Sequence, residues 1–176
     1  MRYIALLRGI NVGGNTLIRM DALKAEFEKL GFKNVVSYIN SGNLAFDINK
    51  SSEKKLSEKI EKSVEAMIGR NISVMVREQS DIDRIVAKDP FKGKYESHKE
   101  MHVLFMKDEM PADKEKLLLE QQSDDEKIVV DGREIYCHLR LGVADSVLLG
   151  KGFIEKKLKL STTARNWRTV QKLAEL

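Results

Sequence analysis

One stretch near the start of the chain, residues 8–16 (RGINVGGNT), has the glycine content of a loop that binds a ligand through its main chain. It holds three of the chain's eleven glycines within six residues. Glycine adopts positive φ easily and allows a ligand to approach the main chain closely. Gly9, Gly14 and Thr16 have the spacing of a phosphate-binding loop, but Asn15 replaces the lysine that reaches the phosphates. The stretch therefore argues against nucleotide hydrolysis and leaves anion binding by loop amides as a hypothesis.

Polar residues gather at two further places in the sequence. Residues Asn40, Ser41 and Gly42 form a turn signal between two apolar runs, and Asn43 follows directly. Residues 151–172 contain seven basic residues and one acidic residue, in a chain whose net charge is +4. Such a concentration of positive charge indicates an anionic partner, nucleic acid or a small anion. A solvated, lysine-rich surface without a partner is the alternative.

The bulk composition is that of a globular protein with a core. The 176 residues are 42% hydrophobic and 33% charged, enough for one domain or two small ones. No apolar run approaches the roughly 20 residues of a membrane helix, and no signal-peptide pattern follows Met1. Cys137 is the one cysteine, so an intramolecular disulfide is excluded. We therefore expect a cytoplasmic protein with no membrane partner.

Hydrophobic periodicity predicts a β-α-β-β-α-β order in the first part of the chain. Strands are expected at residues 3–7, 34–39, 44–48 and 72–77, and helices have their apolar stripes at residues 20–30 and 56–68. This order is the split unit of a ferredoxin-like sandwich. A short helix capped by Ser80 and a polar, glycine-containing stretch follow. We expect a first subdomain at residues 1–79 and a junction at residues 80–100.

Residues 101–176 repeat this order less completely. The pattern predicts a strand at 101–106, a helix at 111–121, a hairpin of strands 127–130 and 134–139, and a helical region at 144–158. The last strand is expected to be missing or shortened, at 158–160, before a C-terminal helix that begins near Ala164. The predicted fold class is α+β, with two ferredoxin-like subdomains that have antiparallel sheets, the second lacking or shortening its last strand.

Three motifs in order, YIALLRGINVGG, YINSGN and TTARNWRTVQKL, together resemble the bacterial domain-of-unknown-function 1697 family. They span both ends of the chain. The resemblance implies two ferredoxin-like subdomains, and it implies no established activity, substrate or catalytic residue. Many members of that family carry a basic residue soon after the glycine pair. This chain instead has Asn15 and Thr16 there, with Arg19 as the next basic residue, which weakens a phosphate-binding interpretation.

The expected topology brings the first two motifs to the same edge of a sheet, because the loop after the first strand and the hairpin after the second emerge together. We hypothesise that the C-terminal helix, with Arg165, Arg168 and Lys172 on one face and Trp167 in the core, lies near this edge. The candidate ligand-binding residues are Arg8, Asn11, Gly13, Gly14, Asn15, Ser41, Asn43, Arg165, Asn166 and Arg168. The alternative is a structural junction, in which asparagine side chains satisfy loop backbone groups.

The remaining residues that could do chemistry have no catalytic or metal-binding spacing. The histidines His98, His102 and His138 show no ligand pattern with Cys137 or an acidic cluster, so we expect no metal site. His102 and His138 lie on expected strands of one subdomain and are candidate neighbours. Cys137 alternates with apolar residues and is expected to be buried. The sequence does not identify a cofactor or a catalytic residue.

Three classes of function remain open. The first, which we favour, is a binding module for an anionic or nucleic-acid partner, acting through the glycine-rich loop and the basic C-terminal region. The second is a small-molecule enzyme with its site at residues 8–15 and 40–43. The third is a protein–protein interaction domain, including a homodimer, without a ligand site.

Overall fold

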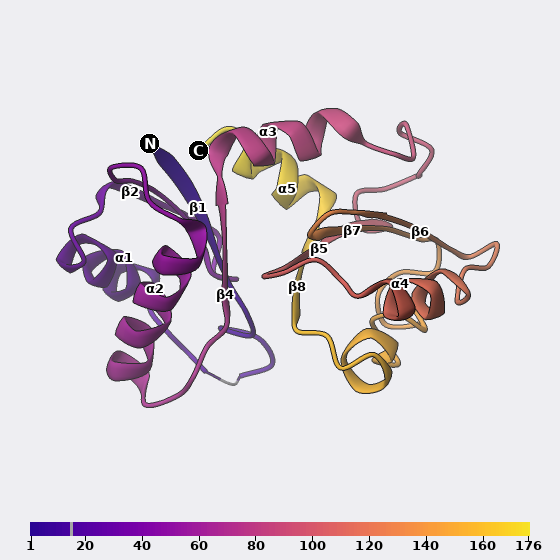
Figure 1. Cartoon of the computed structure of the whole chain (residues 1–176), viewed down its shortest axis with the longest axis horizontal. Helices are drawn as coiled ribbons and strands as arrows, with labels where there is room; N and C mark the ends of the chain where they lie inside the picture. Colours follow the sequence, from indigo (N-terminus) through magenta and orange to yellow (C-terminus); the bar gives the residue numbers. More distant parts are fainter. Residues whose placement is uncertain (15) are drawn as a thin grey trace. The chain divides into compact units, whose positions relative to one another are not determined.

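The structure, a computed structural model, describes residues 1–14 and 16–176 and has an α+β fold with two four-stranded antiparallel sheets (Figure 1). The chain divides into two compact units, residues 1–85 with 172–176, and residues 86–171. The last residues join the first unit through hydrogen bonds from side chains to their main-chain carbonyls. Arg2 Nε donates to the carbonyl of Leu176 at 2.7 Å, and Gln79 Nε2 donates to that of Leu173 at 3.1 Å.

The first unit contains one sheet with two long helices on one face (Figure 1). Its strands pair in the order β2-β3-β1-β4, all antiparallel. The elements are β1 (Arg2–Leu7), α1 (Met20–Lys29), β2 (Lys33–Tyr38), β3 (Asn43–Asp47), α2 (Glu53–Ile68) and β4 (Val74–Glu78), followed by α3 (Gln79–Lys88). The chain order of strands and helices is the one that the periodicity predicts.

The core of the first unit forms where the apolar stripes of the helices meet alternate strand residues. Phe27 of α1 and Ile60 of α2 are fully buried with Leu7, Leu44 and Phe46. Alternation places these strand residues on the helix-covered face. Helix α2 begins where the Ser52 hydroxyl accepts from the Lys55 amide at 3.1 Å and ends at Gly69, whose φ is +71°.

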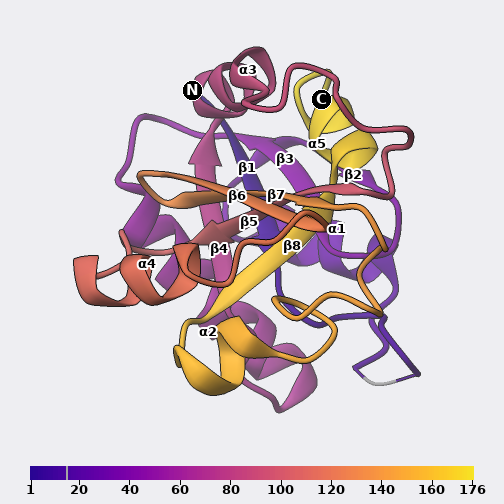
Figure 2. The ribbon, with the colours of Figure 1, turned by 90° about the vertical axis from the view of Figure 1, so that its right-hand side faces the viewer.

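The second unit has its own sheet, in the order β6-β7-β5-β8. Its elements are β5 (Met101–Met106), α4 (Ala112–Leu119), β6 (Glu126–Asp131), β7 (Glu134–Leu139), the π-helix η1 (Phe153–Lys157), β8 (Thr162–Asn166) and α5 (Trp167–Leu173). Figures 1 and 2 show α4 and η1 on the same side of this sheet, where Leu118 and Ile154 share one core with Leu104 and Cys137. Cys137 is buried, as its alternation with apolar neighbours predicts.

The prediction of a missing or shortened last strand at 158–160 is wrong. Strand β8 spans five residues and pairs antiparallel with β5, from Thr162 opposite Met106 to Asn166 opposite His102. The sequence interpretation used Thr162 and Thr163 as helix caps, whereas β-branched threonines also favour extended backbone. Pairing with β5 is a long-range interaction that local spacing does not reveal.

The predicted helices on either side of β8 also change. The C-terminal helix begins at Trp167 rather than Ala164, because the Asn166 side chain accepts from the Thr169 amide at 2.9 Å and caps it. The helical region expected at 144–158 is reduced to η1, which begins after Gly152 in the left-handed conformation (φ +73°). No helix in the described part of the chain is long and apolar enough to cross a membrane.

Candidate functional site

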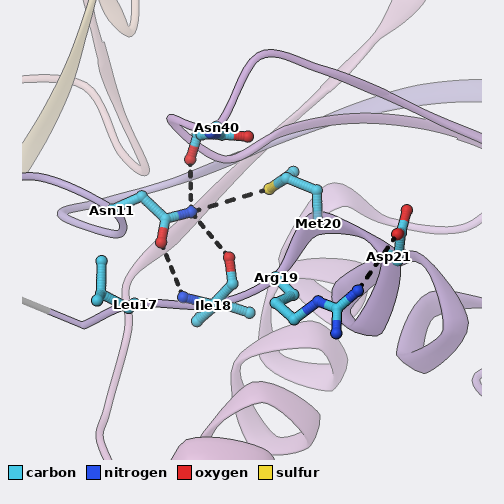
Figure 3. A pocket seen from close by; sticks show the side chains of 7 residues that line it. All are labelled: Asn11, Leu17, Ile18, Arg19, Met20, Asp21 and Asn40. Carbon is cyan, nitrogen blue, oxygen red and sulfur yellow. Dashed lines mark hydrogen bonds and ion pairs between the residues drawn. The ribbon is translucent and has the colours of Figure 1, made fainter.

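The first two motifs meet through the side chain of Asn11. Its amide Nδ2 donates to the carbonyl of Asn40 at 2.7 Å and to that of Ile18 at 3.0 Å, and its Oδ1 accepts from the Ile18 amide at 2.8 Å (Figure 3). Asn11 itself has φ +53°, a left-handed conformation that asparagine tolerates better than most residues. One side chain therefore closes the loop between residues 11 and 18 and ties it to the second motif.

The second motif packs tightly against the first. Gly42 has φ +86°, and a Cβ built on it would lie 2.9 Å from Ile10 Cδ1 and 2.9 Å from Leu7 Cβ. Its carbonyl accepts from the Leu7 amide at 2.9 Å. Asn43 is fully buried, and its amide donates to the carbonyl of Tyr38 at 3.0 Å and to Ser41 Oγ at 2.9 Å. The side chains of Ser41 and Asn43 are thus hydrogen-bonded within the hairpin, and the bond of Asn43 to a main-chain carbonyl is of the kind expected for a structural junction.

A shallow pocket of about 610 Å³ opens beside this junction (Figure 3). Its lining residues come from the first loop, the start of α1 and the second motif: Asn11, Leu17, Ile18, Arg19, Met20, Asp21 and Asn40. Arg19 is the cation here, and its guanidinium lies 4.0 Å from the carboxylate of Asp21, with both side chains more than four-fifths exposed. The carboxylate of Asp21 offsets the charge of Arg19, which weakens the attraction of this pocket for a phosphate.

The glycine pair of the first loop is exposed, with open space where a side chain would lie. Gly13 and Gly14 have φ of +59° and +76°, and no atom lies within 4 Å of a Cβ built on either. The Arg8 main-chain amide donates to Ser73 O at 2.9 Å, and Thr16 Oγ1 accepts from Arg70 Nη1 at 2.6 Å. Asn15, a candidate in the sequence, lies outside the described residues.

The third motif is divided between a strand and a helix. Arg165 lies on β8, where it is buried and its Nη1 donates to Thr163 Oγ1 at 2.7 Å and to Ala164 O at 2.9 Å. Burial lowers the pKa of Arg165 to about 10. The prediction that Arg165 and Arg168 share a helix face is wrong, because α5 begins only at Trp167. Arg168 is exposed and Trp167 is buried. Proximity of this motif to the glycine loop stays a prediction.

Exposed positive charge gathers in residues 151–159. Lys151, Lys156, Lys157 and Lys159 are all exposed, and none forms an ion pair with a residue that the structure describes. Ile154 and Leu158 anchor this segment, because both are buried in the core of the second unit. The exposed lysines therefore lie on a segment whose main chain is fixed by that core.

The histidines and the cysteine divide between the two faces of the second sheet. His102 is opposite Cys137 in the register and His138 is opposite Met101, so the two imidazoles point to opposite faces and are not neighbours. Burial first, then the positive charge of His98, lowers the pKa of His102 to about 4, while a hydrogen bond to the Glu100 main chain opposes the shift. Burial raises the pKa of Cys137 above its ordinary value, which leaves it a protonated thiol rather than a nucleophile.

The sequence interpretation missed a second pocket, of about 370 Å³, on the second unit. It is lined by Pro90, Phe91, Lys92, Lys94, Lys127 and His138. Residues 90–94 fall in the stretch read as a junction, and Lys127 joins His138 only through the register of β6 and β7. The alternation of side chains along β6 and β7 could have indicated that Lys127 and His138 share a face, but only if the register of the two strands were known.

A family model described as "Protein of unknown function (DUF1697)" matches residues 1–136. The chain belongs to this DUF1697 family. The match contains the first two motifs and confirms the resemblance drawn from them. The solved structure titled "The structure of conserved bacterial protein SP0830 from Streptococcus pneumoniae" is similar to this DUF1697 chain, at 26% identity and a TM-score of 0.79, over 99% of this chain and 97% of that one. No curated protein matches the chain.

Proposed function

We propose that this DUF1697 protein is a binding module for a polyanionic partner, with a nucleic-acid backbone as the partner class, and that Lys151, Lys156, Lys157 and Lys159 provide the contacts. The observation that carries the proposal is their exposure without ion pairs in the described part of the chain. Lysines that neutralise phosphates release condensed counterions, which supplies affinity without base recognition.

The support under these lysines favours binding over a merely solvated surface. Ile154 and Leu158 anchor the segment, and the Lys156 side chain packs beside Gly152, whose built Cβ would lie 3.1 Å from Lys156 Cδ. Because the main chain of this segment is already fixed, it loses less conformational entropy on contact with phosphates than a flexible segment would. Glu155 is the one acidic residue between Lys151 and Lys159, so the local charge stays strongly positive.

The glycine-rich loop contributes less to this proposal than its sequence indicates. Asn11, Ser41 and Asn43 are occupied by hydrogen bonds within the junction. Gly13 and Gly14 remain exposed, so their main chain is accessible to a ligand. Arg168 is accessible on α5, whereas buried Arg165 is a structural residue and not a contact for a bulky partner.

The test is fluorescence anisotropy of labelled duplex DNA and of single-stranded RNA over a series of salt concentrations. Each phosphate contact is expected to add about −0.9 for the duplex, or about −0.7 for the single strand, to the slope of log affinity against log salt. Contacts from most of the four lysines predict a duplex slope of about −3. Absence of binding at low salt to either nucleic acid contradicts the proposal.

A second candidate function is supported by the 610 Å³ pocket beside Asn11 and Asn40. Its volume falls in the range of about 300–1,000 Å³ for small-molecule sites. Arg19 and Asp21 side by side suit a ligand that carries both charges, which is the chemistry of a small-molecule enzyme or carrier. A calorimetric titration with zwitterionic amino acids tests it, and Arg19→Ala is expected to abolish any heat of binding.

We also infer that each unit is a ferredoxin-like sandwich. The β-α-β-β-α-β chain order and the strand order β2-β3-β1-β4 support this for the first unit, and the order β6-β7-β5-β8 supports it for the second. The division between residues 85 and 86 falls within the expected junction at 80–100. Cytoplasmic location and a homodimer remain proposals.

A further inference from the structure

The pocket on the second unit has the features of a small-molecule site separate from the lysine-rich segment. It has a volume of about 370 Å³, within the range of about 300–1,000 Å³ typical of such sites. All six lining residues belong to the compact unit formed by residues 86–171. The pocket is therefore built by one folded body.

Its base is formed where β6 and β7 pair. Lys127 and His138 are direct cross-strand partners, so their side chains project from the same face, with Cβ atoms about 5 Å apart. His138 Nε2 lies 3.2 Å from Glu100 Oε2, and both side chains are less than one-fifth exposed. The carboxylate of Glu100 thereby fixes the orientation of the imidazole.

Aromatic rings surround this imidazole. The ring centroid of Phe91 lies 5.7 Å from that of His138, and the ring of Tyr95 lies 6.3 Å from it. Both rings are half-buried, which leaves part of each accessible. The Phe91 ring, which lines the pocket, is tilted by 53° to the imidazole, and the Tyr95 ring lies edge-on to it at 68°. The rings therefore form an apolar corner against which a planar ligand group can pack.

The loop that carries two of the lysines is held in one conformation. Asp89 Oδ2 accepts from the Gly93 amide at 3.0 Å and from the Tyr95 hydroxyl at 3.0 Å. Lys92 adopts φ +51°, a left-handed conformation that costs a non-glycine residue free energy. The loop is therefore ordered by internal hydrogen bonds, and it places Lys92 and Lys94 at the pocket.

Lysines outnumber carboxylates around the pocket. Lys92, Lys94 and Lys127 are exposed, and none is ion-paired with a residue that the structure describes. The carboxylates of Asp89 and Glu100 lie nearby, and their hydrogen bonds to the Gly93 amide, the Tyr95 hydroxyl and His138 hold them away from the three ammonium groups without cancelling their charge. An anionic group at the rim would meet three ammonium groups.

We propose that this pocket binds a small organic anion that carries a planar ring. The ring packs against Phe91 beside the imidazole of His138, and the anionic group lies among Lys92, Lys94 and Lys127. A phosphate and a carboxylate both satisfy this chemistry. The site is independent of the lysine-rich segment and of the nucleic-acid proposal.

The test is isothermal titration calorimetry of the full chain at about 0.15 M salt, where long-range screening is strong. The probes are adenosine monophosphate, indole-3-acetate, adenosine and inorganic phosphate. At least one of the two ring-bearing anions is expected to bind about tenfold or more tightly than both adenosine and inorganic phosphate. Preference between the first two reports the combined fit of the ring and the anionic group. Equal or weaker affinity of both overturns the proposal.

Charge reversal locates the site. Lys94→Glu with Lys127→Glu is expected to reduce the affinity for the tighter probe by about tenfold or more. Lys114→Glu with Lys116→Glu on α4, the same change of charge on the same unit, and Lys156→Glu with Lys157→Glu in the lysine-rich segment are both expected to leave it unchanged. Equal affinity in all three variants, each with an unaltered circular dichroism spectrum, contradicts the proposal.

The imidazole gives a readout of position. In proton NMR, the His138 resonance, assigned with His138→Gln, is expected to shift as the ring-bearing probe is added, because a ring packed beside the imidazole changes its local field. The resonance of buried His102 is expected to stay in place. Binding that leaves the His138 resonance unmoved lies elsewhere and overturns the assignment.

Discussion

The side-chain amide of Asn11 donates to the main-chain carbonyl of Asn40 at 2.7 Å and so joins two family motifs that are separated by helix α1 and strand β2. The same amide group also closes the loop at Ile18. Two motifs that look like parts of a binding site in the sequence are thus joined first by structural contacts. The pocket beside them is a consequence of how the loop is closed.

Replacement of Asn11 tests this structural role. Asn11→Asp keeps the acceptor for the Ile18 amide but loses the donor to Asn40 and Ile18, and places a charge against two carbonyls. We expect a loss of about 2–3 kcal/mol in the free energy of unfolding, measured by urea denaturation. Asn43→Asp makes the same change at the asparagine of the adjacent hairpin, and its free energy of unfolding is measured for comparison. A loss below about 0.5 kcal/mol for Asn11→Asp contradicts the role assigned to this side chain.

Gly42 separates steric contact from backbone strain. Gly42→Ala introduces a Cβ 2.9 Å from Ile10 and Leu7 atoms at φ +86°, whereas Gly14→Ala meets strain at φ +76° but no atom within 4 Å. We expect Gly42→Ala to cost about 1–3 kcal/mol more than Gly14→Ala, since overpacking adds to the same strain. Thermal or urea unfolding of the two variants measures the difference. Equal stabilities would show that the hairpin yields without cost.

His102 predicts an acid-labile fold. Its pKa is about 4 in the folded chain and 6.5 as the ordinary value, with burial as the main cause. Because the folded state disfavours the proton, its stability is complete above pH 6.5 and falls as the pH drops toward 4, by about 3 kcal/mol. Urea unfolding at several pH values measures this loss.

The control for this loss is a pair of histidine variants. His102→Leu is expected to remove most of the decline between pH 6.5 and 4, whereas His138→Gln on the opposite face keeps it. A His102→Leu protein that declines as steeply as the parent would show that another group, such as a carboxylate, controls the acid response.

The strands and helices that the sequence predicts well are those whose own residues carry the signal. Alternating Leu44 and Phe46 define β3, and the stripe that includes Ile60 defines α2, because burial on one face imposes the period directly. Strand β8 escaped because Thr162–Asn166 is mostly polar and Thr also suits a helix cap. The strand conformation depends on pairing with β5, which the spacing of residues within 162–166 does not reveal.

The sites divide in the same way. The meeting of Asn11 with Asn40 follows from two loops that leave one sheet edge, so topology alone predicts it. The pairing of Lys127 with His138 requires the register that the Asp131–Gly132 turn sets, and a shift by one residue would send His138 to the other face. Arg165 was predicted on a helix because strand β8, on which it lies, was not predicted.

The measurement that bears most directly on the proposed function compares two charge reversals in duplex-DNA anisotropy at about 0.1 M salt. Lys156→Glu with Lys157→Glu alters the lysine-rich segment, and Lys54→Glu with Lys55→Glu makes the same change at two exposed lysines of α2. The account predicts that the first pair weakens binding by about tenfold or more and reduces the salt slope by about 2, while the second pair changes both little. Equal effects of the two pairs, or none from either, would contradict a nucleic-acid contact at residues 151–159.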